Sequence, residues 1–161
     1  MTQEFHTIIS APFGAVGLRV VNGNLIGAEF LPIGTEPYLA ADSVARAISR
    51  QIADYLSDAT TVLQVPLQAN GTVFQRRVWQ ALCTIPLGST WTYAELAERV
   101  GSGPRAVANA CGANPIPIVI PCHRVVAKNG LGGFMQGCAD DSLNIKQWLL
   151  DHERRKSVAT G

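Results

Sequence analysis

The stretch TYAELAERVGSGPRAVANACGANP, residues 92–115, decides the fold of the C-terminal half. Thr92 can cap a helix over residues 93–100, because Glu95 stands at the capping-box position. A turn with two glycines and a proline follows, and a second short helix over residues 105–113 ends before Asn114 and Pro115. A helix, a glycine-containing turn and a second helix form the arrangement of a helix-turn-helix.

The second predicted helix has two contrasting sides, because successive residues turn by about 100°. One side carries Val107, Ala110, Cys111 and Asn114. The other side has only small or polar side chains and one arginine: Arg105, Ala108, Asn109 and Gly112. With Ala106, these are the candidate DNA-binding residues. A helix is about 10–12 Å across and the minor groove of B-DNA about 6 Å wide, so a helix that enters this groove needs such a bare face. Close packing against another element is the alternative, and composition leaves both open.

Directly after this stretch, residues 116–124 (IPIVIPCHR) place a thiol beside an imidazole. We expect residues 116–120 to be strand-like and Pro121 to begin a turn, because adjacent side chains on an extended segment point to opposite faces. Cysteine attacks as the thiolate, and a nearby histidinium lowers the thiol pKa whereas an apolar setting raises it. Cys122 and His123 are therefore candidates for a nucleophile and its base.

The first part of the chain predicts a small α/β domain. Three apolar runs separated by tight turns are typical of antiparallel strands: residues 7–9, 15–21 and 25–30. Residues 38–56 have the apolar spacing of a helix, and residues 62–67 resemble a further strand. We expect this domain to cover residues 1–70 and to support a second domain, residues 71–161, that opens with a helix over 74–83.

Size and charge narrow the class of protein. With 161 residues, 47% of them hydrophobic, the chain can bury the core of one domain or of two small ones. Three arginines oppose six acidic residues before Val73 (3 − 6 = −3), and ten basic residues oppose six acidic ones from there on (10 − 6 = +4). The positive charge of the second part is compatible with contacts to phosphate groups, and it is also compatible with an ordinary soluble surface.

No basic leader precedes an apolar stretch, and no window of about 18 apolar residues occurs, so we expect a cytoplasmic protein without a membrane partner.

The cysteines lack paired spacing, which disfavours a disulfide framework and a zinc site: Cys83, Cys111, Cys122 and Cys138. Only His6 stands as a histidine in the first part, and we expect no metal and no cofactor.

Residues 74–153 resemble the O6-alkylguanine-DNA alkyltransferases, also called methylated-DNA-protein-cysteine methyltransferases. The matching segments, in order, are 71–79 (GTVFQRRVW), 92–97 (TYAELA), 105–107 (RAV), 114–115 (NP), 120–125 (IPCHRV) and 148–153 (WLLDHE). The resemblance implies an α/β protein: a small ribonuclease-H-like N-terminal domain, then a mostly helical C-terminal domain with a helix-turn-helix and an active-site loop.

The resemblance also implies direct DNA repair. A monomer would bind duplex DNA through the minor groove, flip out an O6-alkylguanine and move the alkyl group irreversibly to Cys122, with O4-alkylthymine as a further substrate. Flipping exposes an atom that the base stack hides. The thioether product has no polarised carbonyl that water could attack, so each molecule would react once.

Individual roles follow from the same resemblance. His123 would take the thiol proton through a bridging water, and Glu153 would orient the imidazole. Without the resemblance, Glu153 beside three basic residues would be a solvated surface charge. Tyr93 would donate to the flipped guanine, Asn114 would hold the helix-turn-helix against the active-site loop, and Arg105 would enter the base stack in place of the flipped base.

A substrate pocket is also implied. The carbonyls of Cys122 and Val125 would accept the exocyclic amine of guanine, and Trp91, Phe134 and Met135 would line the pocket. Relatives commonly have Gly-Tyr where this chain has Gly-Phe, so Phe134 can stack on the base but lacks a hydroxyl. Residues 138–142 look like an insertion whose aspartates would face away from the duplex or line the alkyl pocket.

Other classes stay open. A protein that only senses alkylated guanine would resemble the same motif but lack the cysteine. A cysteine hydrolase using Cys122 and His123 would turn over repeatedly. A transcriptional regulator would be expected to dimerise and to prefer one DNA sequence.

Overall fold

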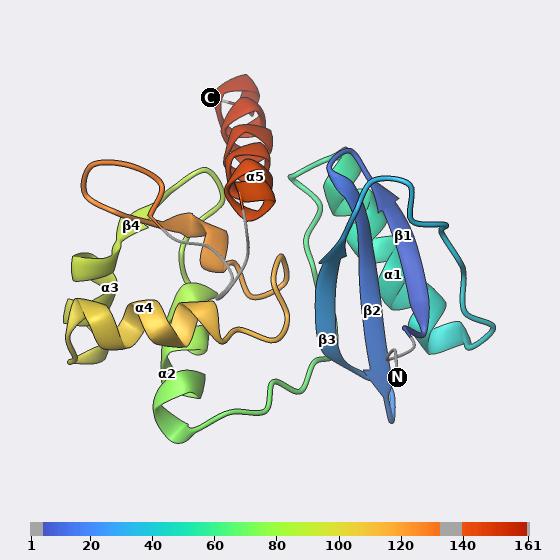
Figure 1. Ribbon diagram of the computed structural model, residues 1–161, viewed down its shortest axis with the longest axis horizontal. Coiled ribbons are helices and arrows are strands. Elements are labelled where there is room, and N and C mark those ends of the chain that lie inside the picture. Colours follow the sequence, from blue (N-terminus) through green and yellow to red (C-terminus); the bar gives the residue numbers. More distant parts are fainter. Residues whose placement is uncertain (1–4, 133–139, 161) are drawn as a thin grey trace. The chain divides into compact units, whose positions relative to one another are not determined.

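The computed structural model describes residues 5–132 and 140–160, without the side chains of residues 140–142 and 156–160. The fold is mixed α/β (Figure 1). The chain divides into two compact units, Met1–Asn70 and Gly71–Gly161.

The first unit contains a three-stranded antiparallel sheet of β1 (Thr7–Ala11), β2 (Gly14–Val21) and β3 (Asn24–Leu31), in chain order. β2 and β3 are joined through Asn22 and Gly23, whose φ values of 52° and 79° are the left-handed values of a type I′ hairpin turn. The three predicted strands are confirmed, each slightly longer than its apolar run.

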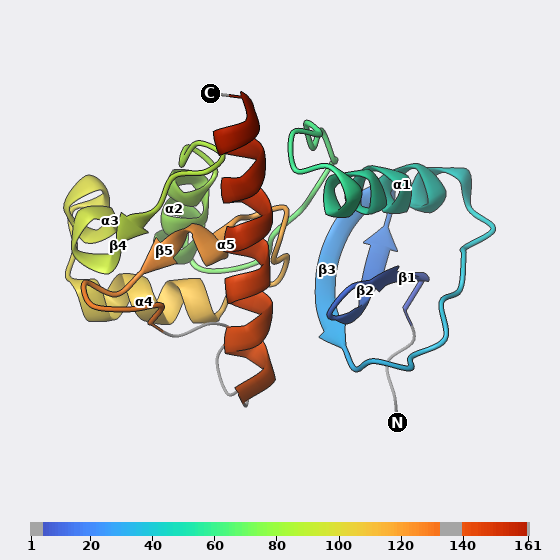
Figure 2. The same cartoon turned by 90° about the horizontal axis from the view of Figure 1, so that it is seen from above.

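Helix α1 (Ser43–Ser57) covers this sheet (Figure 2) and buries Ile48 and Ile52. Asp42 caps the helix by accepting a hydrogen bond from the Ala45 N–H at 2.8 Å. The predicted start at residue 38 is wrong. Tyr38 instead pairs its backbone with Ile8, at 2.8 and 2.9 Å, so the helix begins only at its aspartate cap.

The strand predicted over residues 62–67 is also wrong. This segment meets β3 only at an isolated bridge between Leu67 and Leu25. The Leu25 N–H donates to the Pro66 carbonyl at 2.8 Å, and the Gln68 N–H donates to the Leu25 carbonyl at 3.0 Å. Pro66 has no N–H, so a regular ladder cannot run through it.

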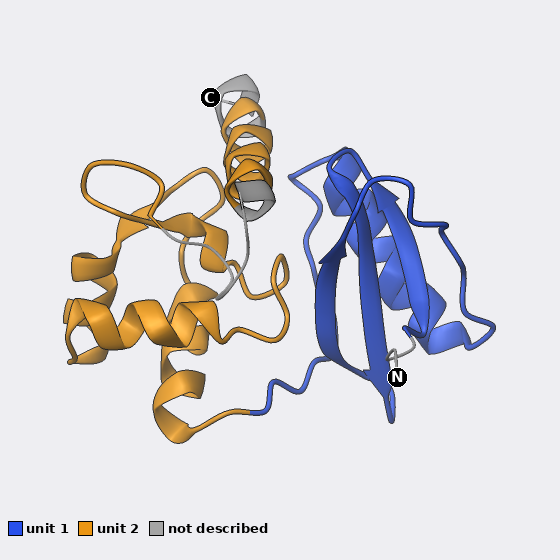
Figure 3. Ribbon diagram, in the orientation of Figure 1, with its two compact units in different colours: residues 1–70 blue, residues 71–161 orange. Residues whose placement is uncertain are grey.

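The second unit is mostly helical (Figure 3). Its elements in chain order are α2 (Val73–Leu82), β4 (Trp91–Thr92), α3 (Tyr93–Val100), α4 (Pro104–Gly112), the 3-10 helix η1 (Cys122–Arg124), β5 (Val125–Val126) and α5 (Asp140–Thr160). Its core contains Val78, Leu82, Leu96, Val107 and Leu149, each fully buried. The Trp79 indole N–H donates to the Ala110 carbonyl at 2.9 Å and ties α2 to α4.

Local signals fix the α3–turn–α4 segment. The predicted capping box is confirmed: Thr92 Oγ1 accepts from the Glu95 N–H at 3.1 Å, and Glu95 Oε1 accepts from the Thr92 N–H at 2.8 Å. Gly101 ends α3 at φ 72°, a left-handed value that favours glycine. α4 begins at Pro104, one residue earlier than predicted, because proline at the first helical position has no N–H to satisfy.

Candidate active site

The segment before Cys122 is a tight turn rather than the predicted strand. The Ile120 N–H donates to the Ile116 carbonyl at 3.0 Å, and Ile118 has φ 77°. Asn114 holds both ends of this turn: its Nδ2 donates to the Ile120 carbonyl at 2.8 Å, and its Oδ1 accepts from the Ile116 N–H at 2.9 Å. A buried asparagine side chain therefore supplies the hydrogen bonds that a neighbouring strand would otherwise provide.

The turn delivers Cys122 and His123 into the interior. Both residues lie in η1, where the Val125 N–H donates to the Cys122 carbonyl. Cys122 is 4% exposed and His123 is 0% exposed. The prediction that this pair sits on a turn is confirmed, and the 3-10 geometry lets two neighbouring side chains face the same interior.

A buried polar network joins η1 to α5. His123 Nε2 lies 2.9 Å from Glu153 Oε2. Arg124 donates twice to the same carboxylate, from Nε to Oε1 at 2.9 Å and from Nη2 to Oε2 at 2.8 Å, and its Nη1 donates to the Ile85 carbonyl at 2.7 Å. Glu153 is 1% exposed, so it is no surface charge.

This network fixes the proton on His123. Burial by itself would raise the pKa of Glu153, but hydrogen bonds from His123 and Arg124 outweigh it and hold that pKa well below its usual range. Because the carboxylate can only accept, Nε2 of His123 carries the hydrogen. Nδ1 then carries a lone pair, and this buried atom has no hydrogen-bond partner among the residues that the structure describes.

Burial decides the resting charges of His123 and Cys122. Burial lowers the pKa of His123, against the opposing effect of Glu153, so the imidazole is neutral and able to accept a proton. Burial also raises the pKa of the Cys122 thiol to about 11, although Asn114 and Lys146 oppose this rise. Desolvation therefore dominates at Cys122, the thiol is protonated at rest, and proton transfer must accompany attack.

The predicted pocket residues are only partly described. Trp91 lies in β4, which pairs in parallel with β5 so that Trp91 is opposite Val125. The Arg99 guanidinium covers the Trp91 ring at 4.0 Å. Half-buried Tyr93 packs against Gly132, where an added Cβ would lie 2.8 Å from Tyr93 Cε2. Phe134 and Met135, like Cys138, lie outside the described residues.

The two sides of α4 match the predicted division. Val107, Ala110, Cys111 and Asn114 are buried. On the other side, Arg105 and Asn109 are exposed, and Ala108 and Gly112 are half-buried; the further DNA-binding candidate Ala106 is exposed. This side therefore offers the surface with little bulk that was expected of a groove-binding helix.

Sequence reasoning missed two charged residues of this site. Arg124 stands in the quoted IPCHRV segment, yet only the structure shows it bound to Glu153. Lys146 is completely buried and its charge acts on Cys122. Its place seven residues before Glu153, on the same face of one helix, was the pattern that could have revealed it.

The described part of the chain lacks two further kinds of feature. Within residues 5–132 and 140–160, no three His, Cys, Asp or Glu side chains are grouped so that they could hold a metal ion. In the same residues, no helix is long and apolar enough to cross a membrane.

The fold and the site define a mixed α/β protein with a buried cysteine beside, in the chain, a buried histidine that is bound to a buried glutamate. The family model for the DNA-binding domain of 6-O-methylguanine DNA methyltransferase matches residues 73–155. The methylated-DNA–protein-cysteine methyltransferase of Methanosarcina barkeri is 37% identical over 92% of this chain and 96% of its own. The chain belongs to the 6-O-methylguanine DNA methyltransferase family.

Solved structures agree in fold over nearly the whole chain. The crystal structure of Mycobacterium tuberculosis OGT in complex with DNA has a TM-score of 0.78 and 35% identity and covers 92% of each chain. The methyltransferase of Mycolicibacterium paratuberculosis is 46% identical over 68% of this chain. The chain spans 66% of that relative's length, and 59% and 32% of the lengths of relatives from a mimivirus and Salmonella typhimurium.

Proposed function

We propose that this protein repairs DNA by transferring the alkyl group of O6-alkylguanine irreversibly to Cys122, with O4-alkylthymine as a further substrate. The observation that carries the proposal is the buried Cys122, followed directly in the chain by a buried His123 that is bound to Glu153, inside the residues that the family model matches. A neutral histidine with its free nitrogen inside the protein is the base that a protonated thiol needs.

The transfer is a single displacement of guanine by the sulfur of Cys122. His123 Nδ1 takes the proton of Cys122 Sγ through a bridging water, and Glu153 stabilises the imidazolium. Sγ attacks the alkyl carbon, the bond from that carbon to O6 breaks, and its electrons stay on guanine. A hydrogen bond from the Tyr93 hydroxyl to the purine lowers the cost of expelling the anion. The thioether resists water, so each molecule reacts once.

DNA is bound, in this proposal, by α3 and α4 acting as a helix-turn-helix. The exposed side of α4 enters the minor groove, where the small side chains of Ala106, Ala108 and Gly112 permit close approach and Asn109 can hydrogen-bond. Arg105, exposed near the start of α4, enters the stack when the damaged base flips out. The +4 charge of the chain from Val73 onward favours contact with phosphates.

The flipped base would lie between Tyr93 and the Cys122–Val125 backbone. The Cys122 carbonyl already accepts from the Val125 N–H, and its second lone pair can still accept the guanine amine. We assign Trp91, Phe134 and Met135 to the walls of this pocket on the family resemblance.

The first unit, for which we propose a ribonuclease-H-like fold, supports the second unit in this proposal. The protein acts as a monomer and without a cofactor.

Stoichiometry tests the proposal. Wild-type protein is incubated with excess duplex carrying one O6-methylguanine, and restored guanine is counted against protein. We expect product formation to stop at one guanine per protein molecule, with intact mass raised by one methylene. Continued product without a mass change would establish a hydrolase, and DNA binding without either change would establish a sensor.

A further inference from the structure

Helix α2 donates one side-chain hydrogen bond to each of the two helices for which we propose a role in DNA binding. The Arg77 guanidinium donates from Nη2 to the carbonyl of Val100, the last residue of α3. The Trp79 indole N–H donates at 2.9 Å to the carbonyl of Ala110, in the last turn of α4. Arg77 and Trp79 leave α2 about 200° apart, which lets them reach two different partners.

Both acceptors lie at a helix end, where the backbone runs short of donors. The last four carbonyls of an α-helix have no N–H partner within the helix. At the end of α3, the Ser102 N–H donates to the Ala97 carbonyl at 2.9 Å, and the Val100 carbonyl accepts from Arg77. A cation at this end is also favoured by the helix dipole. Helix α2 therefore supplies from outside what α3 lacks at its C-terminus.

The two donors have defined positions, because α2 is fixed at its start and on its buried side. Thr72 and Gln75 form a capping box with hydrogen bonds of 2.9 and 3.0 Å. Trp79 is 3% exposed. The backbone of Gly71 lies so close to its ring that an added Cβ would be 2.7 Å from Cζ3. The indole therefore has little room to turn away from α4.

These two hydrogen bonds act on the surface that we propose for DNA. Val100 is the last residue before the turn that leads into α4, so the bond from Arg77 fixes where this turn begins. Ala110 lies on the buried side of α4, and Asn109 is exposed. The bond from Trp79 therefore fixes the rotation of α4 about its axis, and with it the side that faces outward.

We propose that Arg77 and Trp79 are positioning residues, which hold α3 and α4 at the relative angle that binding to duplex DNA requires. Neither side chain contacts DNA in this account, and both act through backbone carbonyls. The inference rests on the proposed role of α3 and α4 in DNA binding.

Two other roles for Arg77 predict different results. Direct contact with a phosphate would mean that its loss reduces the slope of log affinity against log salt by about 0.9. A general disturbance of α2 would also reach the active site, because Arg124 donates at 2.7 Å to the Ile85 carbonyl just beyond the end of α2. Such a disturbance would slow the reaction with a free base as well as weaken binding to duplex.

The test compares full-length wild type with Arg77→Met, Arg76→Met and Trp79→Phe. The two methionine variants remove the same charge from neighbouring exposed positions of α2, but only the first removes the bond to α3. Trp79→Phe removes the indole N–H and keeps an aromatic ring. Fluorescence anisotropy at several salt concentrations measures affinity for a duplex with one O6-methylguanine. The single-turnover rate is measured separately with free O6-methylguanine base.

We expect Arg77→Met and Trp79→Phe to bind the duplex about tenfold more weakly than wild type, the equivalent of one hydrogen bond. Their salt slopes and their rates with the free base should equal those of wild type. Arg76→Met should stay close to the wild-type affinity.

Wild-type affinity in a folded Arg77→Met or Trp79→Phe protein overturns the proposal for that residue. A reduced salt slope for Arg77→Met, or an equal loss of rate with the free base, overturns it as well. Should one variant not fold, the other decides by the same measurements. Failure of both to fold would contradict the proposal, because the two bonds would then be required for the fold itself.

The outcome for this inference can be separated from that for the proposed function. A wild type that binds the duplex but accepts no methyl group refutes alkyl transfer and leaves the comparison of affinities intact. A wild type that binds no duplex overturns both proposals.

Discussion

At the scale of single residues, burial keeps the Cys122 thiol protonated and the His123 imidazole neutral, because a charge on either group would not be hydrated. Both become charged only together, when the proton moves from sulfur to imidazole. We therefore expect the resting protein to be poorly reactive until a substrate is in place, which would protect an acceptor that reacts once in the proposed function.

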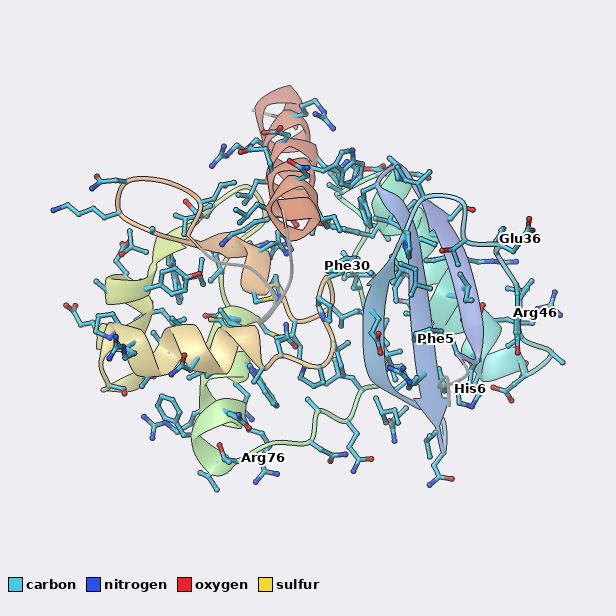
Figure 4. The ribbon with its side chains drawn as sticks, in the orientation of Figure 1. Phe5, His6, Phe30, Glu36, Arg46 and Arg76 are labelled. Atoms are coloured by element: carbon cyan, nitrogen blue, oxygen red, sulfur yellow. The ribbon has the colours of Figure 1, made fainter. Side chains whose placement is uncertain are left out.

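Glu153→Gln tests the carboxylate. We expect alkyl transfer to slow by about 10²-fold or more, because glutamine cannot balance the imidazolium charge. The measurement is the single-turnover rate on methylated duplex. Glu36→Gln, at the exposed glutamate labelled in the first unit (Figure 4), is the matched control and should keep the wild-type rate. Equal single-turnover rates for Glu153→Gln and Glu36→Gln would show that the Glu153 carboxylate takes no part in the transfer.

Gly132→Ala tests the placement of Tyr93. Gly132 has φ 74°, and an added Cβ would lie 2.8 Å from Tyr93 Cε2 and 3.1 Å from the Ala127 nitrogen. We expect a loss of about 1–2 kcal/mol of stability from the backbone alone, and slower transfer because the tyrosine must move. Gly130→Ala is the control, since nothing lies within 4 Å of its Cβ position. A Gly132→Ala protein as stable and fast as this control would contradict the assigned packing.

At the scale of elements, the exposed side of α4 carries the prediction for DNA. We expect Arg105→Ala to weaken binding to methylated duplex by about tenfold, the loss of roughly one stacking contact. Transfer from a single-stranded oligonucleotide should fall less, because no base has to be replaced in a stack. Arg76→Ala on α2, whose exposed arginine is labelled in Figure 4, is the control in fluorescence titrations. If Arg105→Ala and Arg76→Ala weakened duplex binding equally, Arg105 would contribute only its positive charge and not a stacking contact.

Elements with local sequence patterns could be predicted, and elements fixed by distant contacts could not. The capping box of α3 and the proline start of α4 lie within a few residues of the helices that they define. The β4–β5 pair joins Trp91 to Val125, two-residue strands with no periodicity to detect, and α5 was not predicted as a helix. The turn at residues 116–120 reads as a strand because its isoleucines favour strands, whereas Asn114 imposes the turn.

The same distinction applies to the site. Cys122 and His123 are neighbours in sequence, so the motif reveals them directly. Glu153 lies thirty residues later and was assigned only through the family resemblance. Arg124 acts through a buried contact with α5, which no local pattern encodes. The seven-residue spacing of Lys146 and Glu153 could reveal Lys146 only if α5 were predicted as a helix.

At the scale of the whole molecule, acid should destabilise the second unit. His123 and Glu153 both have lowered pKa values in the folded protein, so the unfolded chain binds more protons as pH falls. The stabilising effect of His123 is complete above its unfolded pKa of about 6.5 and is lost as pH falls below it; that of Glu153 is lost below about 4.3.

Urea unfolding between pH 8 and pH 4 measures this effect. All three tryptophans lie in Gly71–Gly161, so their fluorescence reports on that unit alone. We expect the free energy of unfolding to decrease from pH 7 to pH 5 in the wild type and to decrease less in His123→Asn. A decrease of equal size in both proteins would mean that other groups cause it.

The central claim is that the sulfur of Cys122 receives the alkyl carbon. The most direct test is peptide mass spectrometry of the protein after reaction with duplex carrying an isotopically labelled O6-methyl group. The account predicts the label on Cys122 alone, and none on any residue of Cys122→Ser, which should still bind the duplex. Label on another cysteine, or removal of the lesion by Cys122→Ser, would contradict it.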